Sequence, residues 1–382
     1  MERIQCKRPE HELLLLCGRV ALAEKDRENI RAIISAEALD FDYFLLLAKK
    51  HKVLQLVAKH LPSLDPESKI SDFDKYLLHS YYLGIQKINH VKFEELRNIL
   101  QTFVRRGIKA VPLKGAVLTP TEYRDFGLRT LNDIDFLISL EDRRAASECL
   151  KELGYQSGMY NWQTGEVDAV SREEELLWSM HIGNLHPRTK KMDSEYCKYV
   201  TVDFSYDVDL QKNYLASRLL LENAVKTTFL GQETYLLNET DFLIHLCIHL
   251  YKEASNAQWV IYHNDLNLIK FCDVREYLLT IAGNLDPGRF CQRVRELRAE
   301  KGVYYTFHYL DYLYSETYSQ TLLKDLGMDD TGFLDEYGHL DYESPKLWKK
   351  SFYDRFFSLS NLEELVETSK LERIHAENKI NK

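Results

Sequence analysis

The chain has 382 residues, of which 45% are hydrophobic and 29% are charged, and its formal net charge is -9 at pH 7. This length allows two or three domains with a substantial core. The acidic balance argues against a protein that coats long nucleic acid, because phosphates favour a basic surface. No apolar run approaches the roughly 20 residues of a membrane-spanning helix.

The cysteines and the first residues bear on the cellular compartment. The seven cysteines are scattered, odd in number and form no CxxC pair, which favours reduced thiols over a disulfide framework or a zinc site. The leucine patch near the start is surrounded by polar residues, and no small-residue cleavage site follows it. We therefore expect no signal peptide, a cytoplasmic location and no membrane partner.

The first hundred residues predict helices. Apolar residues recur at i, i+3, i+4 and i+7, as in FDYFLLLAKKHKVLQLVAKHL at 41–61 and FEELRNILQTFVRRG at 93–107. We expect an N-terminal helical region over 1–106. The pattern changes at Gly107, where a short β-like IKAVPL leads into a helix within LKGAVLTPTEY.

The middle of the chain alternates between the two periodicities. DIDFLISL at 133–140 predicts a strand, and EDRRAASECLKELG predicts an amphipathic helix that ends at Gly154. Further strands are expected at 154–162, near 175–186 and at 198–208. This pattern predicts a mixed α/β core, with boundaries at residues 107–237.

Helices resume after that core. LNLIKFCDVREYLLTIAG at 266–283 is one of several helical segments that predict a C-terminal helical domain over 238–340. The last residues, 341–382, are expected to hold short helices, at 344–359 and 362–379, and a polar tail.

Two aspartates stand at the start of the predicted central strand. Asp133 and Asp135 are at i and i+2, so their side chains point to one face. Carboxylates this close repel unless a cation lies between them, and Mg²⁺ or Mn²⁺ prefers oxygen ligands. The alternative is a solvent-facing pair on an edge strand, because D-x-D is common by chance. Asp203, between Val202 and Phe204, offers a third carboxylate that would be costly to bury without a partner.

Upstream of these aspartates, the sequence VPLKGAVL has the character of an anion-binding turn. A glycine where a strand passes into a helix lets the backbone approach an anion. Lys114 supplies a point charge beside Gly115, and the guanidinium of Arg129 suits phosphate oxygens. Three carboxylates on adjacent strands beside a phosphate-holding turn are the arrangement that two-metal nucleotidyl transfer needs.

These motifs resemble the uncharacterised bacterial nucleotidyltransferase family of the polymerase-β-like superfamily. The family pattern is a "plKG" turn, a tyrosine, "g-R-x-x-x-DiD-l-l" and a helix that ends in "L-x-x-x-Gy". The matching residues here are Lys114, Gly115, Tyr123, Gly127, Arg129, Asp133, Asp135, Gly154 and Tyr155. The resemblance covers roughly residues 10–310.

The resemblance implies a fold and an activity. The fold is α+β, with a polymerase-β-like core of a mixed sheet and flanking helices, embraced by N- and C-terminal helical regions. The activity moves a nucleoside monophosphate from an NTP, ATP by default, to a hydroxyl or phosphate of a small molecule, peptide or protein, and releases pyrophosphate. The implied ligands of Mg²⁺ or Mn²⁺ are Asp133, Asp135 and Asp203, and the implied triphosphate contacts are Lys114, Gly115, Ala116 and Arg129.

Two departures from the superfamily pattern motivate a second hypothesis. The superfamily has Gly-Ser at the phosphate turn, whereas this chain has Gly115 and Ala116 and so lacks the hydroxyl. The family often shows D-l-H where this chain has Asp-Phe-Ser from Asp203, with Asp207 and Asp209 as alternatives of the same parity. The chain could therefore be a catalytically inactive module that senses a nucleotide or binds a partner.

Two histidines lie in the polar segment before the Asp203 strand. His181 and His186 could reach the acceptor side of such a site. A histidine in a polar loop is more often exposed or hydrogen-bonded, and we assign neither residue a catalytic role.

Overall fold

The computed structural model describes residues 4–36, 39–65, 69–175, 178, 184–315 and 317–366. The chain divides into two compact units, Met1–His79 with Leu246–Lys382, and Ser80–His245. The strand expected near 175–186 and the helix expected at 362–379 fall largely outside the described residues. In the described part of the chain, no helix is both long enough and apolar enough to cross a membrane.

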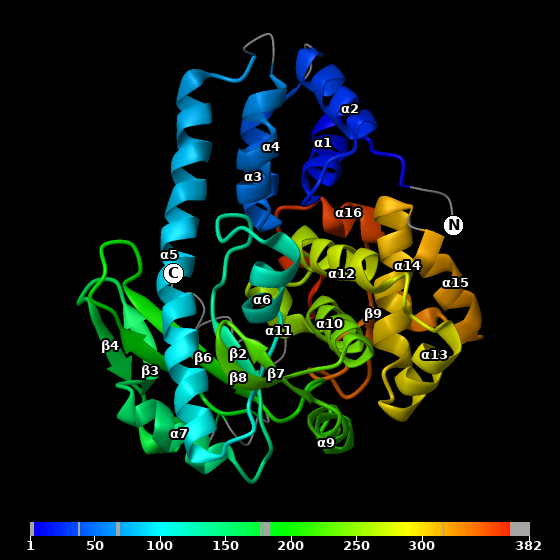
Figure 1. Ribbon diagram of the computed structural model, residues 1–382. Helices are drawn as coiled ribbons and strands as arrows, with labels where there is room; N and C mark the ends of the chain where they lie inside the picture. The colour runs from blue at the N-terminus through cyan, green and yellow to red at the C-terminus, as the bar shows by residue number, and fades with distance from the viewer. Residues whose placement is uncertain are drawn as a thin grey trace. The chain divides into compact units, whose positions relative to one another are not determined.

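The first unit is built mainly of helices from both ends of the chain (Figure 1). Its N-terminal helices are α1 (Pro9–Cys17), α2 (Glu24–Ser35), α3 (Phe41–Lys50), α4 (Leu54–His60) and the start of α5 (Asp72–Arg106). Its C-terminal elements are most of α10 (Glu239–Ala254), α11 (Ala257–Ile261), α12 (Leu268–Ile281), α13 (Pro287–Glu296), α14 (Glu300–Tyr314), α15 (Thr317–Leu326), α16 (Phe352–Phe356) and the strands β9 (Glu336–Tyr337) and β10 (Lys346–Leu347). Hydrogen bonds join the two ends. The Leu268 amide donates to Nδ1 of His51 at 3.0 Å, and Nζ of Lys50 donates to the Phe356 carbonyl at 2.7 Å.

The segment 344–359 differs from the single helix that its periodicity predicts. Its first part forms strand β10, in which Lys346 pairs with Tyr337 of β9. The Trp348 ring stacks on the Tyr337 ring with centroids 4.1 Å apart. Helix α16 begins only after Ser351, whose hydroxyl accepts the Asp354 amide at 3.2 Å. Burial of the tryptophan therefore decides the conformation here, and the helical periodicity does not.

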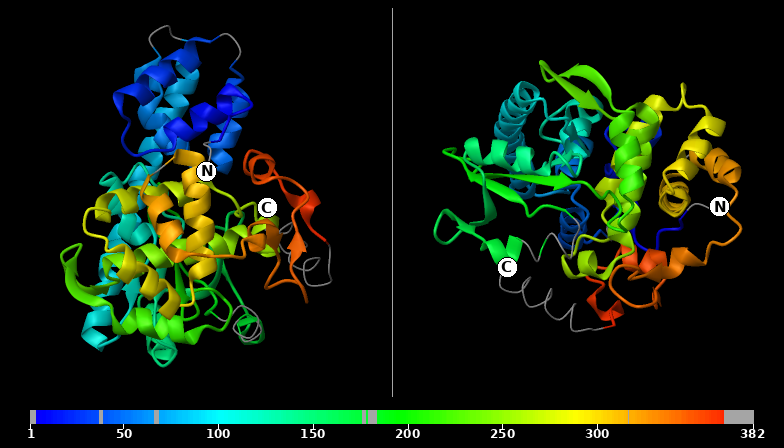
Figure 2. Two further views of the ribbon diagram at one scale, coloured as in Figure 1. Left: turned by 90° about the vertical axis from the view of Figure 1, so that its right-hand side faces the viewer. Right: turned by 90° about the horizontal axis from the view of Figure 1, so that it is seen from below.

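The second unit contains a mixed six-stranded sheet in the order β1-β2-β6-β5-β3-β4. The strands are β1 (Val111–Pro112), β2 (Ile134–Leu137), β3 (Gln156–Asn161), β4 (Glu166–Ala169), β5 (Arg188–Lys191) and β6 (Tyr199–Ser205). Strands β2 and β6 run parallel, and the other neighbours are antiparallel. The mixed α/β character expected for the middle of the chain is thus confirmed. Figures 1 and 2 show β3 to β6 in green.

Helices cover one face of this sheet. The core packs α5 and α7 (Arg143–Glu152) against the even-numbered residues of β2 and β6 (Figure 1). Ile134 and Phe136 of β2 and Val202 of β6 are fully buried in this core. Because side chains alternate along a strand, the odd-numbered residues of both strands face the opposite side of the sheet.

The second unit also has elements that border the sheet. These are α6 (Gly115–Leu118), a π-helical turn (Thr119–Tyr123), α9 (Tyr214–Glu222) and the hairpin of β7 (Val225–Phe229) with β8 (Gln232–Leu236). The hairpin turns at Leu230 and Gly231, with φ of 52° and 77°. This two-residue turn matches the twist of the strands that it joins.

Candidate functional site

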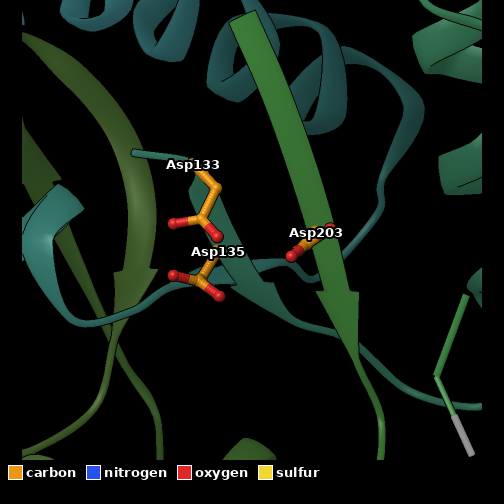
Figure 3. Close-up of side chains that lie close together, drawn as sticks. All are labelled: Asp133, Asp135 and Asp203. Carbon is orange, nitrogen blue, oxygen red and sulfur yellow. The ribbon is translucent and has the colours of Figure 1, made fainter. Parts of the chain in front are cut away.

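The sheet brings three aspartates together. Asp135 of β2 lies directly opposite Asp203 of β6 in the parallel pairing. Asp133 immediately precedes β2 and has the same parity as Asp135. One carboxylate oxygen of each side chain lies within 4.8 Å of those of the other two, and all three residues are partly buried. Figure 3 shows the three side chains gathered in one place.

The arrangement follows from the alternation of the two strands. Phe136 and Phe204 on the even face are buried in the core, so the acidic residues must lie on the other face. Three carboxylates this close repel one another, and a cation between them would offset that repulsion. Their oxygens are the ligand type that Mg²⁺ and Mn²⁺ prefer, so the residues present fit a hard divalent cation.

Lys114 brings a positive charge to this cluster. Its Nζ lies 2.7 Å from Oδ1 of Asp135, and neither side chain is more than one-fifth exposed. The preceding residue, Leu113, donates its amide to the Asp135 carbonyl at 3.0 Å, which ties the turn to β2. Lys114 has φ 49° and ψ -124°, a backbone conformation that is strained for a residue other than glycine. The chain therefore keeps a lysine beside the carboxylates at a conformational cost.

Gly115 allows Arg129 to approach the same turn. A Cβ atom on Gly115 would lie 1.9 Å from Nη1 of Arg129, so only glycine leaves room for this guanidinium. The small residue that follows, Ala116, is buried in the core, and its amide donates to the Leu113 carbonyl at 3.2 Å. The structure thus places Lys114, Gly115 and Arg129 around one turn, while the Ala116 side chain points into the core.

Two residues that the sequence reasoning missed hold the loop before β2. Asn89 of α5 is fully buried, and its Nδ2 donates to the carbonyls of Phe126 and Arg129 at 2.6 and 2.7 Å. Lys92, one turn later, donates to the carbonyls of Leu131 and Asn132, both at 2.6 Å. Burial lowers the pKa of Lys92, while the nearby charge of Asp133 acts in the opposite direction. The sequence signal that could have revealed this role is that Asn89 and Lys92 are polar residues on the apolar stripe of α5.

The alternative residues named from the sequence have other contacts. Asp207 accepts the Lys212 amide at 2.7 Å, and Asp209 accepts the Gln211 amide at 3.0 Å. Both contacts lie in the loop that follows β6. Nδ1 of His186 lies 3.1 Å from the Pro187 carbonyl, and His181 lies outside the described residues.

A pocket of about 490 Å³ lies at the far end of β2, away from the aspartates. Ile138 and Tyr206, which follow β2 and β6, contribute to its lining together with Lys109 and Arg218. Ile138 belongs to the core on the even face of the sheet. The pocket is therefore a different place from the carboxylate cluster.

Comparison with known proteins identifies a family. A family model described as "uncharacterised nucleotidyltransferase" matches residues 37–315, a range that contains the three aspartates, the turn at Lys114 and Arg129. No curated protein and no solved structure is similar enough to the chain to count as a match. Since the matched range covers most of the chain, the protein belongs to this nucleotidyltransferase family.

Proposed function

We propose that the protein is a metal-dependent nucleotidyltransferase with a polymerase-β-like core. It moves a nucleoside monophosphate from an NTP, by default ATP, to a hydroxyl or phosphate of a small molecule, peptide or protein and releases pyrophosphate. The observation that carries the proposal is the cluster of three carboxylates beside Lys114, with oxygens within 4.8 Å of one another. Membership of a nucleotidyltransferase family supports the same reaction class.

The residues of the site divide into two groups by charge. Asp133, Asp135 and Asp203 would hold Mg²⁺ or Mn²⁺. When bound, such ions offset the charge of the phosphoryl oxygens and activate the acceptor oxygen. Lys114 and Arg129 bind the phosphates through their cationic groups.

The glycine and alanine of the turn complete the proposed phosphate site. Gly115 permits the close approach of Arg129, because a larger residue would occupy the position of its guanidinium. Ala116 keeps the first turn of α6 anchored in the core, with its amide bonded to Leu113. The proposed site therefore relies on the two cationic side chains where the superfamily pattern supplies a serine hydroxyl.

A second candidate is a catalytically inactive module that senses a nucleotide or binds a partner. The observation that favours it is the contact of Lys114 with Asp135, because an ammonium group occupies one face of the carboxylate that would hold the metal. The missing hydroxyl at Ala116 points the same way. Consumption of the nucleotide distinguishes an enzyme from such a module.

Calorimetric titration of the four NTPs with Mg²⁺ tests the proposal. We expect one NTP to bind in a Mg²⁺-dependent manner, and we expect Asp133→Ala/Asp135→Ala to lose that binding. Pyrophosphate release across a panel of acceptors then separates the two candidates. An NTP that binds to the carboxylates and is never consumed would favour the module, and the absence of Mg²⁺-dependent binding would contradict the enzyme.

Lys114→Gln tests whether the lysine competes with the metal. The change removes an ammonium 2.7 Å from Asp135, so we expect Mn²⁺ to bind about fivefold tighter when no nucleotide is present. NTP affinity should fall about tenfold because a charged phosphate contact is lost. Electron paramagnetic resonance of free Mn²⁺ gives the first affinity, and calorimetry gives the second.

The matched control for this variant is Lys191→Gln, which removes an exposed lysine paired with Glu166. This control should leave both affinities unchanged. Unchanged Mn²⁺ affinity in Lys114→Gln would show that the ammonium group does not compete with the ion.

Gly115→Ala tests the position of Arg129. The added Cβ would lie 1.9 Å from Nη1, so the flexible guanidinium must move away from the turn while the fold is kept. We expect NTP affinity to fall about tenfold and the thermal midpoint to change little. Calorimetry and thermal denaturation measure the two effects. The control is Gly84→Ala in α5, where an added Cβ meets no atom within 4 Å. Wild-type NTP affinity in Gly115→Ala would contradict a phosphate contact by Arg129.

A further inference from the structure

Three aromatic side chains meet on the sheet that carries the aspartates, at the start of β6 and the end of β3. The rings of Tyr160 and Tyr199 stack with centroids 5.0 Å apart and an interplanar angle of 17°. The indole of Trp162 meets Tyr160 at 85° and 5.3 Å, and meets Tyr199 at 79° and 6.1 Å. Trp162 is 72% exposed. We call these three residues the aromatic corner, since the exposed indole stands nearly perpendicular to a stacked tyrosine pair.

The aromatic corner lies on the same face of the sheet as the carboxylates. Tyr199 and Asp203 are both odd-numbered residues of β6, so their side chains share a face. Tyr160 reaches that face because its ring stacks on Tyr199. Burial raises the pKa of the Tyr199 phenol, because the protein interior disfavours the charged phenolate.

The order of the strands separates the two sides of the carboxylate cluster. The turn at Lys114 follows β1, on one side of β2, whereas Tyr199 of β6 and Tyr160 of β3 lie on the other side. In nucleotidyl transfer, the acceptor oxygen forms a bond to the α-phosphorus while the bond from that phosphorus to pyrophosphate breaks. The acceptor oxygen and the leaving pyrophosphate lie in line, on opposite sides of the phosphorus. The proton of the acceptor hydroxyl passes to water. If the β- and γ-phosphates lie at the Lys114 turn, the acceptor approaches from the side of β6.

We propose that the aromatic corner binds the acceptor of the transfer by stacking against the apolar face of a ring that carries the accepting hydroxyl. This inference rests on the proposed function and names the class of its acceptor. A phenol ring and a sugar ring share the required chemistry, an apolar ring face together with hydroxyl groups, and both stack on exposed indole.

Saturation-transfer NMR with three ring probes tests the proposal. The probes are phenol, methyl β-glucoside and phenyl β-glucoside, each titrated in the presence of Mg²⁺ and the α,β-methylene analogue of the NTP that binds. The variant is Trp162→Ala. Because the indole is exposed, we expect this variant to keep its fold, and circular dichroism checks this directly. The control is Met159→Ala, which removes a 58% exposed apolar side chain from β3, where successive residues alternate between faces.

We expect at least one probe to bind the wild type and Met159→Ala equally, and Trp162→Ala to bind it about tenfold more weakly. A response to phenol alone would identify an aryl acceptor, and a response to methyl β-glucoside alone would identify a saccharide. Equal binding in Trp162→Ala, or no probe binding to the wild type, would overturn the inference. NTP binding is measured separately, so a protein that binds Mg²⁺ and NTP but no ring probe loses this inference and keeps the proposed nucleotide site.

Discussion

Replacing Asp135 with asparagine is expected to lower the rate of pyrophosphate release by more than about a hundredfold. Mutation of residues that only support metal ligands already lowers activity by about 10- to 100-fold, and loss of a ligand itself should have a larger effect. Asp135 is central to the cluster, since it lies opposite Asp203 and contacts Lys114. The substitution keeps the size of the side chain and removes its charge. It leaves Lys114 without a carboxylate partner at this position, and it weakens the attraction for a divalent cation. A coupled phosphate assay with the NTP identified by calorimetry measures the effect.

The control for this prediction is Asp193→Asn, which neutralises an exposed carboxylate in the loop after β5. We expect the control to retain the wild-type rate and Mg²⁺ dependence. Thermal denaturation of both variants separates a lost ligand from a lost fold. Full activity of a folded Asp135→Asn protein would contradict the assignment of the metal site.

Asn89→Ala is expected to lower the free energy of unfolding by about 3 kcal/mol. The Asn89 amide makes three hydrogen bonds, donating to Phe126 and Arg129 and accepting the Leu131 amide at 3.2 Å. Alanine leaves these buried backbone groups without the side chain that satisfies them, and each such group is costly in a low-dielectric core. Urea denaturation measures the change.

Asn98→Ala provides the comparison on the same helix. Asn98 is exposed, and its Nδ2 makes a single contact of 3.3 Å with Glu95. We expect this variant to change the free energy of unfolding by less than about 0.5 kcal/mol. Asn89→Ala should also weaken NTP binding, because the released loop carries Arg129 and leads to Asp133. If Asn89→Ala is as stable as Asn98→Ala, the loop before β2 is held mainly by Lys92.

Local periodicity was sufficient to predict several features of the chain. The spacing of Asp133 and Asp135 predicts a shared face because side chains alternate in any strand. The helical spacing over 41–61 and 93–107 corresponds to α3, α4 and the end of α5. These predictions depend on residues close together in the sequence, which is the information that periodicity contains.

Other local signals were present but not used, or gave the wrong result. The alternation over β7 and β8, with Leu230 and Gly231 between them, marks a hairpin that was not predicted. The helical pattern over 344–359 fails because Trp348 packs on Tyr337 instead of continuing a helix. In that segment, long-range burial outweighs a weak local preference.

The partners of each strand were decided only by the tertiary structure. Nothing in the sequence near Asp203 states that β6 lies parallel to β2, yet this pairing is what puts Asp203 opposite Asp135. The contact between Lys114 and Asp135 and the aromatic corner depend on the same strand order. Residue type and spacing therefore determined which groups could form a site on each strand. The even-numbered residues of β2 and β6 are buried against α5 and α7, and this burial stabilises the sheet. The odd-numbered aspartates are thereby brought together on the opposite face, although their own carboxylates repel one another.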